Sequence, residues 1–167
     1  MKIHMRALLL TFAAAVGVSA SSATVDAQSQ RGQPKTPFGV GDFGKLKWLE
    51  GNWVGASPGE PGVFERYRFV NDSTVEITYF ADSTFGRETG TGRLYLTVGR
   101  IYHTFGPSRW GASNIDANGI FFVPQVNARN TFAWTMQSPN AWTSTLRSGA
   151  SGRERVTVYQ MRRANSP

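Results

Sequence analysis

From residue 48 to residue 163 the chain consists of short apolar or aromatic runs separated by short polar breaks. Within the runs, bulky side chains recur at every second position, which is typical of strands with one face turned inward. The breaks are rich in Gly, Pro, Asn, Asp and Ser, which favour tight turns. The pattern predicts ten strands, at residues 52–56, 63–70, 74–81, 92–98, 100–105, 109–115, 120–126, 131–137, 141–147 and 153–163.

One helical turn is predicted before the first strand, within "DFGKLKWL" at residues 42–49. Because the breaks between strands are short, consecutive strands are expected to be antiparallel neighbours. A long antiparallel sheet avoids exposed edges most simply by closing on itself. The sequence therefore predicts an all-β fold, an antiparallel up-and-down β-barrel of about 8–10 strands. A two-layer sandwich is the main alternative.

Two residue pairs predict local features of the sheet. Asn118 and Gly119 in "DANG" favour a hairpin turn, because both residues tolerate a positive φ. Pro124 lacks a backbone N–H, so the strand that contains it is expected to lie at an edge or to carry a bulge.

The first 27 residues are predicted to be a cleaved secretory signal peptide. Lys2 and Arg6 precede the uncharged run "ALLLTFAAAVGVSA", which is too short to span a bilayer, and small residues follow. Cleavage is expected after Ala27, with Ala20 and Ala23 as alternatives. The mature protein would then be secreted or periplasmic, without a transmembrane segment.

The remaining chain is expected to divide into three parts. Residues 28–41 are rich in Gln, Gly and Pro and predict a flexible linker. Residues 42–163 form the barrel, and residues 164–167 a disordered tail.

Composition excludes several functional classes. The sequence has no cysteine, which excludes disulfides, thiol nucleophiles and cysteine–metal sites. Removal of residues 1–27 takes away Lys2, Arg6 and Asp26 and changes the net charge from +7 to +6. The basic residues are scattered, whereas nucleic-acid binding requires a concentrated basic stripe. With one histidine left in the mature chain, we expect no metal site and no cofactor.

The paired tryptophans in "KWLEGNWVGA" suggest how one end of the barrel is closed. Gly51 would let the chain turn in closely, and Trp53 would lie across the barrel floor. Arg162 and Arg163 end the last strand, and alternation sends one of them inward. Its guanidinium could stack on the indole of Trp53.

This arrangement resembles the calycin superfamily, which includes lipocalins, fatty-acid-binding proteins, avidins and nitrobindin-like barrels. The resemblance rests on the Gly-x-Trp at 51–53 after a helical turn and on the arginine of the last strand. It covers residues 44–163. The opening "LKWLEGNWVG" is most similar to bacterial secreted lipocalin-like domains of unknown function. The resemblance implies a barrel with an interior ligand site.

The better-known members of the superfamily differ from this chain at their functional residues. Nitrobindin-like proteins use a C-terminal histidine as the haem ligand, and "SGRERVTVYQMRR" contains none. The Arg-x-Tyr of fatty-acid-binding proteins is replaced by Arg155 and Tyr159, four residues apart. "NAWTSTL" is similar to avidins, but the aspartate expected on their last strand is missing. Lipocalins often have Thr-Asp-Tyr at a turn, where this chain has "VNDST" and "FADST".

The candidate ligand-binding residues lie on strands whose two faces both carry bulky side chains. In "VFERYRFV" we favour an interior face that contains Glu65 and Tyr67 over one that contains Arg66 or Arg68. His103 shares the apolar face of its strand with Ile101 and Phe105, where a hydrogen-bonded core histidine is commoner than a functional one. The predicted lining of the ligand site is Glu65, Tyr67, Tyr79, His103, Trp134 and Tyr159.

Three functional hypotheses follow, and no catalytic residue is assigned. The first is an exported barrel that binds a small apolar or amphipathic molecule. The second is a barrel enzyme that uses Tyr, Glu, Arg or His for acid–base chemistry. The third is a structural or interaction module of the cell envelope. A cavity of roughly 300 Å³ or more with aromatic walls would favour binding. An enclosed Glu–Tyr or His–Glu pair within hydrogen-bond reach would favour catalysis, and a filled interior would favour the structural module.

Overall fold

Ten antiparallel strands form a closed barrel in the computed structural model, which describes residues 36–150 and 153–164. The predicted signal peptide (1–27), residues 28–35 of the predicted linker and residues 165–167 of the predicted tail lie outside the described residues. The strands are β1 (Gly51–Ala56), β2 (Val63–Asn71), β3 (Thr74–Phe80), β4 (Glu88–Thr97), β5 (Arg100–Phe105), β6 (Ser108–Ile115), β7 (Gly119–Val126), β8 (Asn130–Ser138), β9 (Ala141–Ser148) and β10 (Arg155–Arg163).

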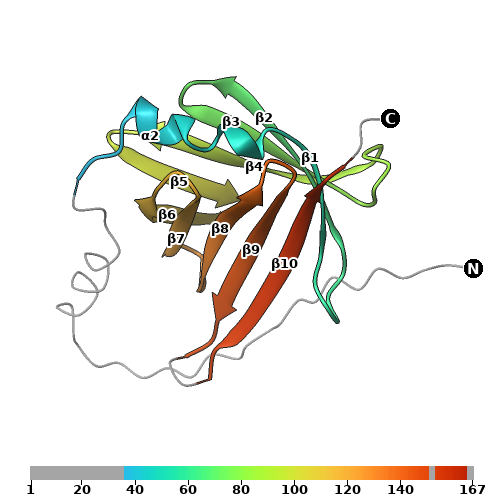
Figure 1. The fold of residues 1–167 in the computed structure, drawn as a ribbon. Helices are drawn as coiled ribbons and strands as arrows, with labels where there is room; N and C mark the ends of the chain where they lie inside the picture. The colour runs from blue at the N-terminus through green and yellow to red at the C-terminus, as the bar shows by residue number, and fades with distance from the viewer. Residues whose placement is uncertain (1–35, 151–152, 165–167) are drawn as a thin grey trace, which may run out of the picture.

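Each strand pairs with its neighbours in sequence, and β1 closes the sheet by pairing with β10 (Figure 1). Trp53 on β1 lies opposite Arg163 on β10 and opposite Glu65 on β2. Because each of the ten described strands pairs with a neighbour on both sides, none of them is an edge strand, although the β5–β6, β7–β8 and β1–β10 pairings span only part of each strand. The predicted up-and-down barrel is confirmed, and the sandwich alternative is wrong.

Two short helical segments lie across one end of the barrel (Figure 1). They are α2 (Val40–Gly44) and the 3₁₀ turn η1 (Lys47–Leu49). Phe43 of α2, Leu49 of η1 and Leu46 between them are fully buried. Helix α2 begins two residues before the predicted segment, inside the stretch expected as linker. Its first turn is held by the Asp42 carboxylate, which accepts the backbone N–H of Gly39 at 3.0 Å.

Strand β4 begins four residues earlier than predicted. The added residues 88–91 are Glu, Thr, Gly and Thr, so the sequence shows no apolar alternation there. In the barrel this segment pairs with β3, where Gly90 lies opposite Tyr79 and a register shift follows before Phe80. Backbone pairing extends the strand where side-chain pattern gave no evidence for it.

The hairpin predicted at Asn118 and Gly119 is present, but its turn differs from the expected one. Neither residue has a positive φ. Instead the Asp116 carboxylate accepts the backbone N–H of Asn118 at 2.8 Å. A Cβ atom at position 119 would lie 2.3 Å from the Trp134 carbonyl oxygen, so glycine is required there by close packing against β8.

Pro124 coincides with a bulge. Arg109 lies opposite Val126, and the next residue of β6, Trp110, lies opposite Pro124, so Gln125 is the extra residue in β7.

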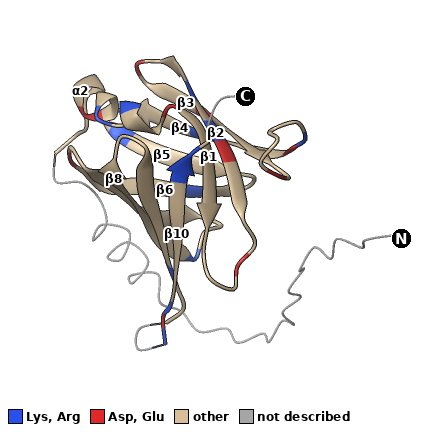
Figure 2. Cartoon of the chain, turned by 45° about the vertical axis from the view of Figure 1, so that its right-hand side comes forward, with Lys and Arg blue, Asp and Glu red and all other residues tan. Residues whose placement is uncertain are grey.

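Charged residues are spread over α2, the loops and several strands (Figure 2). On the outer face of the sheet, Arg68 pairs with Glu76. At the end of the barrel opposite the helices, Arg155 pairs with Glu60. Among the described residues, no helix has the length and apolar character needed to cross a bilayer.

Candidate functional site

The floor of the barrel is built around Trp53, whose side chain is fully buried. The indole Nε1 donates a hydrogen bond of 2.6 Å to the carbonyl oxygen of Leu49, at the end of η1. The guanidinium carbon of Arg163 lies 4.4 Å from the centre of the indole ring. This separation is typical of a cation–π contact.

Arg163 also joins three parts of the chain through backbone carbonyls. Its Nη1 donates to Glu50 O at 2.6 Å, and its Nη2 donates to Trp48 O and to Pro139 O, both at 3.2 Å. The last strand is thereby fixed to the 3₁₀ turn and to the β8–β9 connection. We refer to Gly51, Trp53 and Arg163 as the floor cluster.

Gly51 gives Arg163 the space that it occupies. Its φ is +120°, and a Cβ atom on its backbone would lie 2.4 Å from Nη1 of Arg163. Both facts require glycine at this position. Arg162, the other predicted candidate, is exposed, in agreement with its alternation relative to Arg163 along the strand.

Aromatic rings connect the floor to the middle of the barrel. Trp142 lies 5.9 Å from both Trp48 and Trp53, measured between ring centres. Trp134 lies 5.6 Å from Trp142 and 5.6 Å from Tyr67. Most of these pairs meet edge to face, which is the geometry that aromatic side chains prefer. This half of the interior is filled by side chains.

The other half of the interior contains a cavity of about 180 Å³. It reaches the end of the barrel away from the helices, where Phe105 is 46% exposed. Five of the six predicted ligand-binding residues line the cavity, and Tyr67 lies beside it. The lining residues are Val63, Glu65, Tyr79, His103, Phe105, Trp110, Asn130, Phe132, Trp134, Ser144, Leu146, Tyr159 and Met161.

Glu65 is the carboxyl group of the cavity wall. The Tyr67 hydroxyl donates a hydrogen bond of 2.7 Å to Glu65 Oε2. Burial raises the pKa of Glu65 from its ordinary value to about 7, against the opposing effect of the Tyr67 hydrogen bond. Burial likewise raises the pKa of Tyr67 well above its usual range. The cavity therefore contains a carboxyl group that exchanges its proton near neutral pH.

His103 lies in an aromatic environment at 5% exposure. Its ring centre is between 5.4 and 5.9 Å from those of Trp110, Phe122, Phe132 and Trp134. Nε2 is 3.5 Å from the Tyr79 hydroxyl, a long contact, and the enclosed Nδ1 has no partner among the described residues. Burial lowers the pKa of His103 to about 3. His103 is therefore a buried, neutral histidine, as expected of a core residue. It differs from the expectation in that one ring nitrogen, Nδ1, has no hydrogen-bond partner among the described residues.

Trp110 and Phe132 also line the cavity and were not among the predicted wall residues. Phe132 is two positions from Trp134 on the same strand, so alternation alone could have identified it. Trp110 is fixed at the open end by a hydrogen bond of 3.0 Å from its Nε1 to Asn130 O. Its depth in the barrel depends on the register of β6, which the sequence does not specify.

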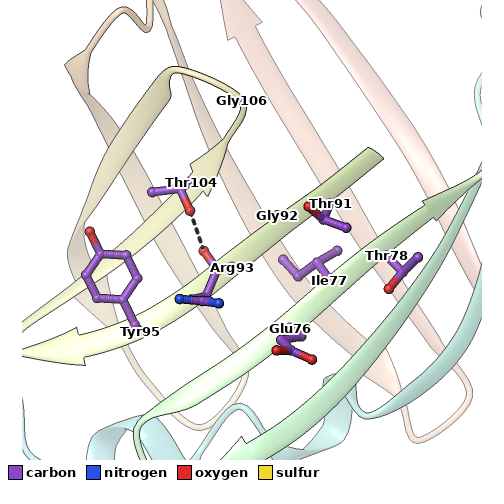
Figure 3. Close-up of a pocket in the computed structure, with 9 residues that line it drawn as sticks. All are labelled: Glu76, Ile77, Thr78, Thr91, Gly92, Arg93, Tyr95, Thr104 and Gly106. Carbon is purple, nitrogen blue, oxygen red and sulfur yellow. Dashed lines mark hydrogen bonds between the residues drawn. The ribbon is translucent and has the colours of Figure 1, made fainter. Parts of the chain in front are cut away.

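A second hollow, of about 640 Å³, lies on the outer face of β3, β4 and β5 (Figure 3). Glu76, Thr78, Arg93, Tyr95 and Thr104 border it, and Thr104 Oγ1 donates to the Arg93 carbonyl oxygen at 3.4 Å. Its carboxylate, Glu76, already has Arg68 as a partner. The interior cavity is thus the stronger candidate, because its polar groups lack such partners.

No protein-family model matches the chain, and no curated protein sequence matches it.

Proposed function

We propose that the protein is an exported barrel that binds one small apolar or amphipathic molecule in the interior cavity. The observation that carries the proposal is the aromatic-walled cavity next to a filled floor. Trp110, Phe132 and Trp134 supply apolar walls, and Glu65 supplies a polar group that could orient a ligand. Binding sites commonly combine apolar walls with a few polar groups.

The size of the cavity limits the ligand. At about 180 Å³ it is smaller than the roughly 300 Å³ that was expected of a binding barrel and that drug-sized ligands require, so the size criterion set from the sequence is not met. A dry cavity of about 150 Å³ is large enough for benzene. The ligand is therefore a molecule of roughly eight to ten non-hydrogen atoms, rather than a long-chain lipid.

The resemblance to calycins agrees with this proposal. The closed antiparallel barrel, the helical segment across one end and the Trp53–Arg163 contact support membership of that superfamily. A solved relative that binds a small molecule in the same half of the barrel would strengthen it.

Native mass spectrometry of protein purified from its own host tests the binding proposal. We expect a co-purified molecule in the wild type. Ser144→Phe should abolish it, because Ser144 lines the cavity and phenylalanine would fill the space. Thr145→Phe is the matched control, since alternation turns the next residue outward. Absence of a ligand across mild preparations of the wild type would contradict the proposal.

Export is tested separately, by the N-terminal sequence of the protein recovered from the cell envelope or medium. The proposed cleavage after Ala27 gives a chain that begins at Gln28. Recovery only from the cytoplasm, with residues 1–27 still attached, would contradict export and leave the binding proposal standing.

Proton transfer in the same cavity is a second candidate function, favoured by the Glu65–Tyr67 pair. A carboxyl group with a pKa of about 7 suits general acid–base catalysis at neutral pH. The test is α-proton exchange of phenylacetone in deuterated water, followed by NMR. Wild type should accelerate exchange and Glu65→Gln should not. An exchange rate equal to that of buffer would contradict catalysis on this class of substrate.

A further inference from the structure

The acidic group of the cavity lacks a basic partner. In the described part of the chain, no Lys or Arg lines the cavity, and no basic side chain forms an ion pair with Glu65. Only Oε2 of Glu65 accepts a hydrogen bond from the described residues, and its donor is Tyr67. Oε1 is therefore available to a ligand.

The arginines of the adjoining strands are held elsewhere. Arg66 donates to Asn52 Oδ1 at 2.8 Å and lies over the ring of Phe80. Arg155 pairs with Glu60 at the open end, and Arg163 belongs to the floor cluster. None of these three guanidinium groups is free to neutralise Glu65, and a buried charge without a partner is costly.

The titratable groups around Glu65 are otherwise neutral. Burial is the main reason that the pKa of Tyr67 on β2, Tyr79 on β3 and Tyr159 on β10 is raised, and the nearby Glu65 carboxylate raises each of them further. His103 on β5 stays uncharged because burial lowers its pKa to about 3. The described cavity wall contains no positively charged side chain that would repel a cation.

Aromatic rings complete the environment of a cation. Phe105, Trp110, Phe132, Trp134 and Tyr159 border the same space as Glu65. The face of an aromatic ring attracts a positive charge, so the rings around Glu65 would add to its attraction for an ammonium group.

We propose that the cavity selects a small organic amine, whose ammonium group binds the free oxygen of Glu65 and whose apolar part packs against the aromatic wall. This inference rests on the proposed binding function and adds the chemical class of the ligand. The volume of about 180 Å³ accommodates a primary arylalkylamine of the size of 2-phenylethylamine.

Three probes of nearly equal size and different charge test the selectivity: 2-phenylethylamine, 2-phenylethanol and phenylacetate. Binding is measured at pH 8 by calorimetry and by quenching of tryptophan fluorescence, since Trp110 and Trp134 line the cavity. We expect the amine to bind at least roughly tenfold more tightly than the alcohol, and phenylacetate to bind more weakly than either.

Glu65→Gln supplies the second arm. The amide keeps an acceptor for the Tyr67 hydroxyl but removes the charge, so the amine should lose its advantage and bind like the alcohol. Glu76→Gln is the matched control, because Glu76 pairs with Arg68 on the outer face of the sheet, and it should leave the selectivity unchanged. The wild-type comparison stays decisive if Glu65→Gln fails to fold.

The outcomes separate the two proposals. Wild-type binding of the alcohol at least as tight as that of the amine overturns the amine inference and leaves the binding function standing. An amine preference that persists in folded Glu65→Gln also overturns it. Failure of all three probes, together with the absence of any co-purified ligand, overturns both.

Discussion

Both halves of the barrel interior are aromatic, but they differ in whether their ionisable group has a partner. On the floor, the charged Arg163 donates to carbonyls of Glu50 and Trp48, although the enclosed indole nitrogens of Trp48 and Trp142 have no partner among the described residues. In the cavity, Glu65 has no basic partner and His103 Nδ1 has no hydrogen-bond partner among the described residues. A paired buried charge stabilises a fold, whereas an unpaired one weakens it unless a ligand completes it.

The comparison predicts opposite responses to substitution. Changes in the floor cluster should lower the free energy of unfolding, whereas neutralising Glu65 should raise it at neutral and alkaline pH.

Trp53→Ala should cause the largest loss. Removing a fully buried indole leaves a void in the floor and should reduce the free energy of unfolding by about 3–5 kcal/mol. Urea denaturation followed by circular dichroism measures the change. Val54→Ala, one residue along and facing the other way, is the control and should cost about 1 kcal/mol or less. A near-neutral Trp53→Ala would show that the indole does not support the floor.

Glu65→Gln should stabilise the protein as the pH rises. The folded carboxyl keeps its proton up to a pKa of about 7, whereas the unfolded one releases it near 4.5, so rising pH favours the unfolded wild type. Between about pH 4 and pH 8 the stability of Glu65→Gln relative to wild type should increase by about 3 kcal/mol. Urea titrations at a series of pH values measure it.

His103 does not disturb that comparison. Its lowered pKa destabilises both proteins as the pH falls from about 6.5 to about 3, so its contribution cancels in the difference between them. A difference that stays constant across the pH range would show that Glu65 titrates as an ordinary surface carboxyl.

Arg163→Met should destabilise by about 2 kcal/mol, because three backbone carbonyls lose a charged donor. Arg162→Met removes the neighbouring exposed guanidinium and should change stability by less than about 0.5 kcal/mol. Thermal and urea unfolding of the pair measures the contrast. Equal effects would mean that the floor contacts of Arg163 contribute nothing beyond its charge.

Arg155→Gln should have the smallest effect. Its ion pair with Glu60 lies at the open end, with Arg155 largely exposed to solvent. Such pairs contribute about 1 kcal/mol or less. A larger loss in the same unfolding assay would show that the open end is held as firmly as the floor, and would remove the contrast between the two halves.

The sequence was informative about the strands because alternation and turn residues report directly on local structure. It was less informative where the outcome depended on closure of the barrel. Both faces of β2 and β3 carry bulky side chains, so the inward position of Glu65 and Tyr67 follows from pairing with β1 and β3. The choice of Arg163 over Arg162 follows likewise from the register that places it opposite Trp53.

The chemistry of the cavity could be predicted only in part. Strand alternation indicated which residues share a face, but not how deep each lies. The missing basic partner of Glu65 is a property of three strands together, since Arg66, Arg155 and Arg163 are each held by contacts outside the cavity. Such a property emerges only when the register of every strand is known.

The most direct test of the unpaired cavity carboxyl is an NMR titration of the Glu65 side-chain carboxyl carbon, assigned by comparison with Glu65→Gln. In the free protein it should titrate near pH 7. Addition of 2-phenylethylamine should lower the pKa, because the ammonium group favours the charged form. Titration near 4.5 in the free protein, with no response to the amine, would contradict the account.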